Sequence, residues 1–342
     1  MRILIVKLSS LGDVIHTLPI LVDIKNQYPD VQLDWVVEPS FASLLEFNPN
    51  IDRVISCSLR DWVKEGFGFR TLAKVKSFLK DLRQTPYDYV LDLQGLSKSA
   101  LIARCAALTP QGVRVAMGNR TDGSSYESLT RWLSDRAIAL PKRIHALERG
   151  RLLCAKTLHY EVPSEIDFGL LGAGKENVSS SAFEPEVAQS SSDQPPKVLL
   201  IHGTSRTDKT WGLSHWSEIA ERLNASGYEV CVTYGNDAEL EFVNELMAKV
   251  KGLTFWPKQS LRDLSTLMRG CYGAIGVDSG VSHLAVALNL VHVQIYNFPT
   301  DWRTGPLHCS YQLSVHAHPS PGVDLVWQKW LLAVDEWQSK HV

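Results

Sequence analysis

The chain has 342 residues, enough for two domains that each bury a core. Its hydrophobic fraction of 44% and charged fraction of 21% are ordinary for a globular protein. The formal net charge of -2 gives no whole-protein attraction to nucleic acid, so we expect no nucleic-acid partner.

The cysteines and the N-terminus exclude further classes of protein. The six cysteines are scattered without C-x-x-C spacing, which predicts reduced, mostly buried thiols and neither a zinc site nor a disulfide framework. The apolar run Ile3–Val6 is too short for a signal peptide, and charges interrupt every stretch that could span a bilayer. We therefore expect a cytoplasmic protein.

The first strand and the turn after it form the most informative unit. The run Ile3–Val6 predicts a buried strand, and the apolar periodicity from Val14 onward predicts a helix. Ligands gather where such strands end and helix N-termini expose unpaired N–H groups. Asp13, in the turn between them, stands where a reacting group would be placed. An aspartate there would serve equally well as a helix cap.

Strand and helix patterns alternate along both halves of the chain. In the first half, strands are predicted at 3–6, 33–37, 54–55 and 89–93, with helices near 14–27, 69–83 and 96–107. In the second half, strands at 198–201, 229–233, 272–276 and 291–295 alternate with helices near 214–226, 236–250, 260–269 and 280–289. This alternation predicts an α/β fold with parallel sheets. Because the pattern restarts halfway, we expect two Rossmann-like halves.

Two segments fall outside this alternation. Residues 172–196 are rich in Ser, Gly and Pro and lack apolar periodicity, which predicts an interdomain linker. The last segment places apolar residues at 323, 326, 327, 330, 331, 334 and 337, on one broad helical face. Only Lys329 is basic inside it, so we expect this face to pack on protein and not on a membrane.

Three polar motifs at predicted strand ends resemble those of the bacterial lipopolysaccharide heptosyltransferases, glycosyltransferase family 9. They are K-x-S-S-x-G-D-V-x-H-T-L-P from Lys7, H-G-T-S-R-x-D-K-x-W from His202, and V-D-S-G-x-S-H-L from Val277. Segments 34–38, 92–99 and 145–149 add to the match. The resemblance implies a GT-B architecture, in which two Rossmann-like domains face each other across a cleft. Its parts would be an acceptor domain at 1–171, the linker at 172–196, an ADP-sugar domain at 197–322, and a terminal helix at 323–342 that crosses back to the first domain.

The second half can supply each contact that a nucleotide sugar needs. Lys209 and the hydroxyls of Thr204 and Ser205 suit diphosphate oxygens, and the loop Ser279–Gly280 can present backbone N–H groups. By similarity, Lys209 and Asp278 clamp the donor. The similarity also implies that Glu239 binds the ribose hydroxyls and that the segment around Gln259 contacts the edge of the adenine. The full expected donor set is Thr204, Ser205, Lys209, Glu239, Gln259, Asp278, Ser279, Gly280 and His283.

Helix capping is the alternative for two of these positions. Asp278 could simply cap the next helix, and a plain loop with a cap at Ser260 would look like the adenine segment. The chain has no D-x-D sequence, so we expect Lys209 and helix N-termini to replace a metal and predict neither a metal nor a cofactor. It also lacks G-x-G-x-x-G and a Tyr-x-x-x-Lys pair, which argues against a dehydrogenase and a nucleotide-sugar epimerase.

On the acceptor side, an inverting transfer needs a base for the acceptor hydroxyl. Asp13 matches the family's proposed base, and Glu38 remains its rival. The expected acceptor, lipid A carrying Kdo sugars, is anionic, and basic residues between 60 and 83 could meet it, although a solvated helix face explains much of that run. The region 113–136 matches the family poorly, and the arginine expected there is Arg120, Arg131 or absent. The expected acceptor set is Ser10, Gly12, Arg60, Lys64 and Lys98.

The sequence thus predicts an inverting enzyme that moves L-glycero-D-manno-heptose from its ADP donor to Kdo of Kdo2-lipid A. We expect a monomer, peripheral on the cytoplasmic face of the inner membrane. The alternatives are a family member with a different acceptor, such as heptosyltransferase II, and a non-catalytic sugar-nucleotide-binding protein.

Overall fold

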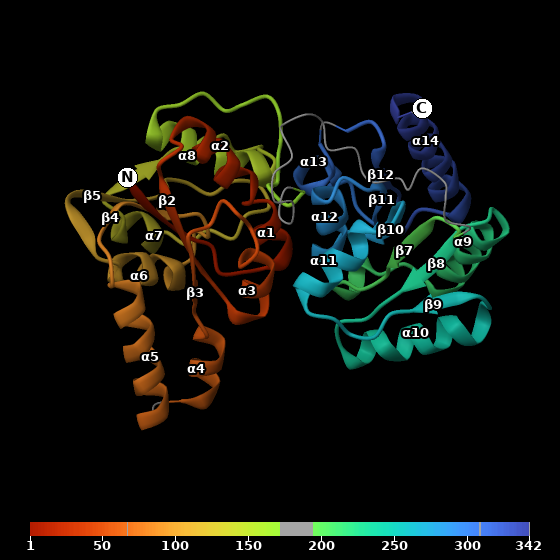
Figure 1. Ribbon diagram of the computed structural model, residues 1–342, viewed down its shortest axis with the longest axis horizontal. Coiled ribbons are helices and arrows are strands. Elements are labelled where there is room, and N and C mark those ends of the chain that lie inside the picture. The colour runs from red at the N-terminus through yellow and green to blue at the C-terminus, as the bar shows by residue number, and fades with distance from the viewer. Residues whose placement is uncertain (67, 172–193, 308, 342) are drawn as a thin grey trace. The chain divides into compact units, whose positions relative to one another are not determined.

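The computed structural model describes residues 1–66, 68–171, 194–307 and 309–341. The chain divides into two compact units, Met1–Ala173 and Gly174–Val342, and each is described by itself below. Both units are parallel α/β structures, as the alternation of strand and helix patterns predicted (Figure 1). The predicted linker lies almost entirely outside the described residues.

The first unit is a six-stranded parallel sheet in the order β3-β2-β1-β4-β5-β6. Its strands are β1 (Arg2–Val6), β2 (Gln32–Val37), β3 (Arg53–Ser56), β4 (Tyr87–Asp92), β5 (Leu108–Met117) and β6 (Arg136–Ile138). The chain turns to opposite sides of β1 for β2 and for β4. The carboxyl ends of β1 and β4 therefore flank the switch point at which ligands bind in such sheets.

Eight helices belong to the described part of the first unit. They are α1 (Leu11–Ile15), α2 (Pro19–Gln27), α3 (Pro39–Leu45), α4 (Leu59–Glu65), α5 (Phe69–Leu82), α6 (Ser97–Cys105), α7 (Leu129–Leu133) and α8 (Ala146–Leu158). The single helix expected near 14–27 is in fact two, because Pro19 starts a new helix, where its missing N–H costs nothing. Helices α4 and α5 project together away from the sheet (Figure 1).

The second unit repeats the same strand order, β9-β8-β7-β10-β11-β12 when read from the other edge. Its strands are β7 (Lys197–Ile201), β8 (Glu229–Val232), β9 (Leu253–Phe255), β10 (Gly273–Val277), β11 (Val291–Tyr296) and β12 (Gln312–His316). Its helices are η1 (Thr207–Lys209), α9 (Leu213–Ala225), α10 (Asp237–Lys249), α11 (Leu261–Arg269), α12 (Gly280–Ala287), α13 (Asp301–Thr304) and α14 (Val323–His341). The switch point here lies between β7 and β10.

Helix α14 packs on the second unit itself, against β11, β12 and α9. Trp330 is fully buried there, and Gly273 lacks the Cβ that would stand 2.7 Å from the Trp330 ring. The predicted apolar face is confirmed at Val326 and Trp337, but Leu331 is exposed. That the helix also reaches the first unit stays a prediction.

The sheets bury the apolar runs that predicted them. Ile3–Val6 is fully buried, as expected for a central parallel strand covered on both faces. All six cysteines are unpaired and four of them are buried, in line with the expected thiols. Within the described residues, no helix combines the length and the apolar character needed to cross a bilayer.

Candidate active site

Asp13 lies at the start of α1, directly beyond the carboxyl end of β1. Ser10 caps this helix, and its backbone N–H and its hydroxyl donate to Asp13 Oδ2 at 3.1 and 3.0 Å. The second oxygen, Oδ1, faces the ammonium of Lys7 at 3.5 Å. The helix-cap interpretation of Asp13 therefore applies to Oδ2, which supports the helix start. The interpretation as a reacting group applies to Oδ1, which does not support the helix start. The Asp13 side chain keeps 36% of its surface exposed.

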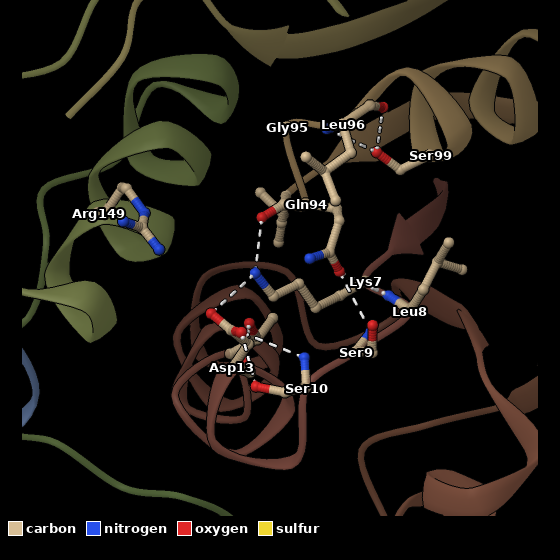
Figure 2. Close-up of polar contacts among 12 residues, drawn as sticks. Lys7, Leu8, Ser9, Ser10, Asp13, Gln94, Gly95, Leu96, Ser99 and Arg149 are labelled. Atoms are coloured by element: carbon tan, nitrogen blue, oxygen red, sulfur yellow. Dashed lines mark hydrogen bonds and ion pairs between the residues drawn. The ribbon is translucent and has the colours of Figure 1, made fainter. Parts of the chain in front are cut away.

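Lys7 is the buried partner of Asp13. Its Nζ also donates to the Leu93 carbonyl oxygen at 3.1 Å (Figure 2). Burial alone would raise the pKa of Asp13, but the Lys7 charge and the hydrogen bonds from Ser10 outweigh it and hold that pKa below its ordinary value. Burial lowers the pKa of Lys7, while Asp13 acts in the opposite direction.

A pocket in the first unit opens beside this pair. Arg149 of α8 points toward it (Figure 2), and its guanidinium donates to Thr121 Oγ1 at 3.3 Å. The positive charge of Arg149 also lowers the pKa of Asp13. The pocket is lined by Lys7, Asp13, His16, Thr17, Leu93, Met117, Ala146, Arg149, Gly150 and Leu153.

The turn after β4 is hydrogen-bonded to the turn after β1. Gln94 Oε1 accepts hydrogen bonds from the backbone N–H groups of Leu8 (3.0 Å) and Ser9 (3.2 Å). Asp92 Oδ1 in turn accepts from the N–H groups of Gln94 and Gly95. Burial raises the pKa of Asp92 to about 6, although these hydrogen bonds, Ser99 and Lys7 oppose the shift.

Glu38, the rival base, is held by a cation. It lies buried at the end of β2, with Arg60 Nε 3.0 Å from Glu38 Oε1. The same guanidinium donates to Ser9 Oγ at 3.2 Å. Glu38 therefore fixes Arg60 beside the turn that carries Asp13, whereas the Asp13 carboxylate is the more open of the two.

The remaining acceptor-side predictions are spread around this edge of the sheet. Gly12 lies in α1, next to Asp13, and Lys98 is half-buried near the start of α6. Lys64 is exposed on α4, one turn beyond Arg60. Arg120 is exposed just past the carboxyl end of β5, while Arg131 lies on α7.

In the second unit, Lys209 and Asp278 form a short ion pair. Lys209 Nζ lies 2.6 Å from Asp278 Oδ2, and Asp278 is buried. His283 Nε2 and Thr304 Oγ1 lie 3.5 Å from the other carboxylate oxygen. Burial would raise the pKa of Asp278, but His283 and Lys209 together hold it well below its usual range.

Helix α12 begins at this ion pair. Its N-cap is Ser279, whose hydroxyl oxygen accepts from the Ser282 N–H, so the capping interpretation of Asp278 is wrong. Gly280 is the first helical residue, and backbone N–H groups at the start of a helix can bind an anion. Thr204 Oγ1 donates to the Asp278 carbonyl oxygen at 3.4 Å, which brings the loop after β7 to the same place.

Glu239 lies in the first turn of α10, after β8. Its carboxylate accepts from the Gly235 N–H at 2.7 Å and from Asn236 Nδ2 at 2.8 Å. A Cβ on Gly203 would stand 2.7 Å from this carboxylate, so a larger residue there would have to displace the Glu239 side chain. The Glu239 carboxylate thus lies beside the loop that carries Thr204.

Two predicted donor residues lie on the surface of the second unit. Ser205 is exposed in the loop after β7, and Gln259 is half-buried between β9 and α11. Ser260 does cap α11, accepting from the Asp263 N–H at 3.1 Å, so the capping interpretation is confirmed for that residue. Among the described residues, no three His, Cys, Asp or Glu side chains cluster in a way that could hold a metal ion. The absence of a metal stays a prediction.

Sequence reasoning assigned no role to Lys7, Asp92, Gln94 or Arg149. All four lie in segments that carried the family resemblance, and Asp92 lies near the end of the strand predicted at 89–93. Their roles depend on the pairing of β1 with β4, which sets Val6 opposite Asp92. No local spacing reveals that contact.

Comparison with known proteins gives one consistent result. The model of glycosyltransferase family 9 (heptosyltransferase) matches residues 75–327. The chain is 35% identical to lipopolysaccharide heptosyltransferase 1 of Escherichia coli K12, covering 88% of this chain and 89% of that one. It is 34% identical to the Pseudomonas aeruginosa protein of the same name, covering 88% and 79%.

Solved structures agree in fold. The E. coli heptosyltransferase WaaC with ADP is similar over the full length of both chains, with a TM-score of 0.80 and 30% identity. E. coli ADP-heptose LPS heptosyltransferase II has a TM-score of 0.73 at 21% identity, covering 98% of this chain and 100% of that one, which shows the fold alone. The predicted GT-B architecture of two Rossmann-like units is confirmed by these matches.

Proposed function

This chain belongs to glycosyltransferase family 9, the heptosyltransferases, and is a glycosyltransferase of lipopolysaccharide biosynthesis. From that premise we propose that it is a heptosyltransferase I. It would transfer L-glycero-D-manno-heptose from ADP-L-glycero-D-manno-heptose to a Kdo hydroxyl of Kdo2-lipid A, with inversion at the anomeric carbon. The observation that carries this proposal is the partly open Asp13 carboxylate beside Lys7, at the switch point of the first sheet.

The donor is proposed to bind at the switch point of the second sheet. The diphosphate would meet Lys209, the N-terminus of α12 and the hydroxyls of Thr204 and Ser205. Asp278 would accept hydrogen bonds from the heptose hydroxyls, and Glu239 from the ribose. An ADP complex of the E. coli relative supports a nucleotide ligand for this fold. Because cationic and N–H groups can carry the diphosphate charge, we expect activity to persist in EDTA.

Asp13 is proposed as the general base. The acceptor oxygen would attack the anomeric carbon as the bond from that carbon to the diphosphate oxygen breaks. Asp13 Oδ1 would take the hydroxyl proton, and ADP would leave with the bonding electron pair. Arg60, held by Glu38 beside the same turn, would contact the acidic groups of the acceptor together with Lys64 and Lys98.

The acceptor is proposed to be reached at a membrane surface, by a monomer that docks through α4 and α5. On these helices Val63 is 76% exposed and Phe69 is 94% exposed. Trp62 packs on Phe78 at 5.4 Å between ring centroids, which ties the two helices together. Exposed apolar side chains surrounded by cationic ones are suited to binding an anionic bilayer surface. The exposed cations of these helices are Arg60, Lys64, Arg70, Lys74, Lys76 and Lys80.

One assay tests the acceptor assignment. Purified protein would be given ADP-heptose with either Kdo2-lipid A or lipid A whose Kdo already carries one heptose, and ADP release would be followed. Rapid release with the first acceptor alone supports the proposal. Release with the second alone identifies a paralogue of the heptosyltransferase II kind, and ADP-heptose binding without release on either acceptor identifies a non-catalytic binding protein.

A further inference from the structure

The buried ammonium of Lys7 has no part in the transfer step described above, yet it faces the proposed base. We propose that Lys7 is a positioning residue that holds the Asp13 carboxylate ionised and turned toward the pocket. This inference rests on the proposed role of Asp13 as the base. It assigns Lys7 no contact with substrate, since its side chain is only 4% exposed.

Lys7 is fixed from two neighbouring strands. Its backbone N–H donates to the Val36 carbonyl oxygen at 3.3 Å, and its own carbonyl oxygen accepts from Trp35 Nε1 at 2.9 Å, both in β2. On the other side, its Nζ donates to the Leu93 carbonyl oxygen, just past β4. A lysine held in this way carries a positive charge at a defined point, and that point is 3.5 Å from Asp13 Oδ1.

The turn between Lys7 and Asp13 is held as firmly. Gln94 Oε1 accepts from the N–H groups of Leu8 and Ser9, and Ser10 holds Asp13 Oδ2 (Figure 2). The carboxylate plane is therefore set by Ser10 on one oxygen and by the Lys7 charge on the other. Gln94 thus holds the turn without adding a charge, so its contacts can be removed while the Lys7 charge stays in place.

Charge explains why the pair is needed. A carboxylate lined by protein tends to keep its proton, and a protonated Asp13 could not accept one from the acceptor. A cation a few ångströms away favours the charged form. The other titratable or charged groups that face the pair are Asp92 at the end of β4, His16 at the end of α1, and Arg149 with His145 on α8; His16 and His145 lie edge to face, 5.7 Å apart.

Lys7→Met tests the inference, because it keeps an unbranched side chain only one atom shorter and removes the charge. We expect the acid limb of the kcat/KM profile to move to higher pH by about one to three units. Lys7→Arg should restore a limb close to wild type. Gln94→Ala, which loosens the turn and keeps the charge, should lower kcat without moving the limb.

Lys25→Met is the matched control. Lys25 also donates to a backbone carbonyl, that of Val31 at 2.7 Å, and also faces a carboxylate, Asp52 at 3.4 Å, but it lies away from the pocket. Its pH profile should be that of wild type. If Lys7→Met loses activity evenly across pH, or keeps its acid limb in place, Lys7 is only structural and the inference fails.

A second measurement does not depend on turnover or on how well Lys7→Met folds. The Asp13 carboxyl carbon, assigned by the loss of its NMR signal in Asp13→Asn, should show no protonation step in wild type between about pH 8 and pH 5. A wild-type step in that interval overturns the inference. If Asp13→Asn instead retains wild-type turnover, the proposed base is wrong, and the carboxyl titration still decides what Lys7 does.

Discussion

Asp13 and Asp278 each face a lysine, but their surroundings give them different chemistry. Asp278 has a 5% exposed side chain, and both of its oxygens have cationic or hydroxyl partners. Such a carboxylate stays ionised and accepts hydrogen bonds, which suits recognition of sugar hydroxyls. Asp13 has one oxygen bound by Ser10 and the other open beside Lys7, so it retains the capacity to take a proton.

The Lys209 ammonium should contribute directly to nucleotide affinity. Lys209→Met would remove the proposed charge-assisted contact to the diphosphate, worth about 1.5–3 kcal/mol, so ADP should bind roughly ten- to a hundredfold more weakly. Calorimetric titration with ADP measures this. Lys249→Met, at an exposed position late in α10, is the control and should bind ADP normally. An unchanged ADP affinity in Lys209→Met would remove this residue from the donor site.

Asp92 should make the stability of the protein depend on pH. Its pKa of about 6 lies above that of an unfolded aspartate, so between these values the folded state binds the extra proton. Its stabilising contribution is therefore complete at low pH and is lost as the pH rises through about 6. Asp92→Asn should gain about 1–1.5 kcal/mol relative to wild type between pH 5 and pH 7.5, by urea unfolding. If the unfolding free energies of both proteins changed equally with pH, the raised pKa of Asp92 would be contradicted.

At the scale of elements, buried strands and amphipathic helices were predictable, and several strands at or next to a sheet edge were not. Strand β5 contains Pro110 and Gly112, and its pairing with β4 shifts register between Tyr87 and Tyr89, so it lacks a clean apolar run. Strands β6 and β9 have three residues each and give no periodicity. Strand β12, at the opposite edge of the second sheet, is half polar.

The candidate site divides in the same way. Asp13, Lys209 and Asp278 stand at strand ends within polar motifs, and the sequence alone therefore points to them. The contacts by which Lys7 and Gln94 support Asp13 and its turn could not be predicted, because they join strand ends that are far apart in sequence. Leu8 and Gln94, for example, are 86 residues apart. Contacts of that kind follow from strand order, which is a property of the whole sheet.

Helices α4 and α5 should decide membrane docking. Phe69→Ser, at the exposed first residue of α5, removes the largest apolar group of the proposed docking surface, so binding to vesicles rich in anionic lipid should fall several-fold in a sedimentation assay. Leu332→Ser, at an exposed position on α14, is the matched control and should bind as wild type does. Equal binding by both variants would place the membrane contact elsewhere or abolish it.

At the scale of the whole molecule, one strand order is used twice, and the proposed function gives each copy a different part of the chemistry. The first unit holds Asp13 and Arg60, and the second holds Lys209, Glu239 and Asp278. Nucleotide binding should therefore depend on the second unit alone, while transfer should depend on both. Substitutions that spare one function and abolish the other are the expected consequence of this division.

Helix α14 should stabilise the second unit. Trp330→Ala empties a fully buried position between this helix and β10, which should cost about 3–5 kcal/mol of folding free energy. The folded fraction should still bind ADP with nearly normal affinity. Thermal unfolding would measure the loss, with Leu331→Ala at the exposed neighbouring position as the control. A Trp330→Ala protein as stable as wild type would show that this packing is unimportant.

The turnover of Asp13→Asn, measured beside its affinity for ADP, tests the central claim most directly. Asparagine keeps the size of the side chain and an oxygen for the Ser10 N–H, so the helix start survives while the base is removed. We expect turnover of ADP-heptose and Kdo2-lipid A to fall by roughly 10²–10⁴-fold with ADP affinity unchanged, and Asp30→Asn, at an exposed site, to behave as wild type. Turnover of Asp13→Asn within a few-fold of wild type would make Asp13 a helix cap and leave Glu38 as the base.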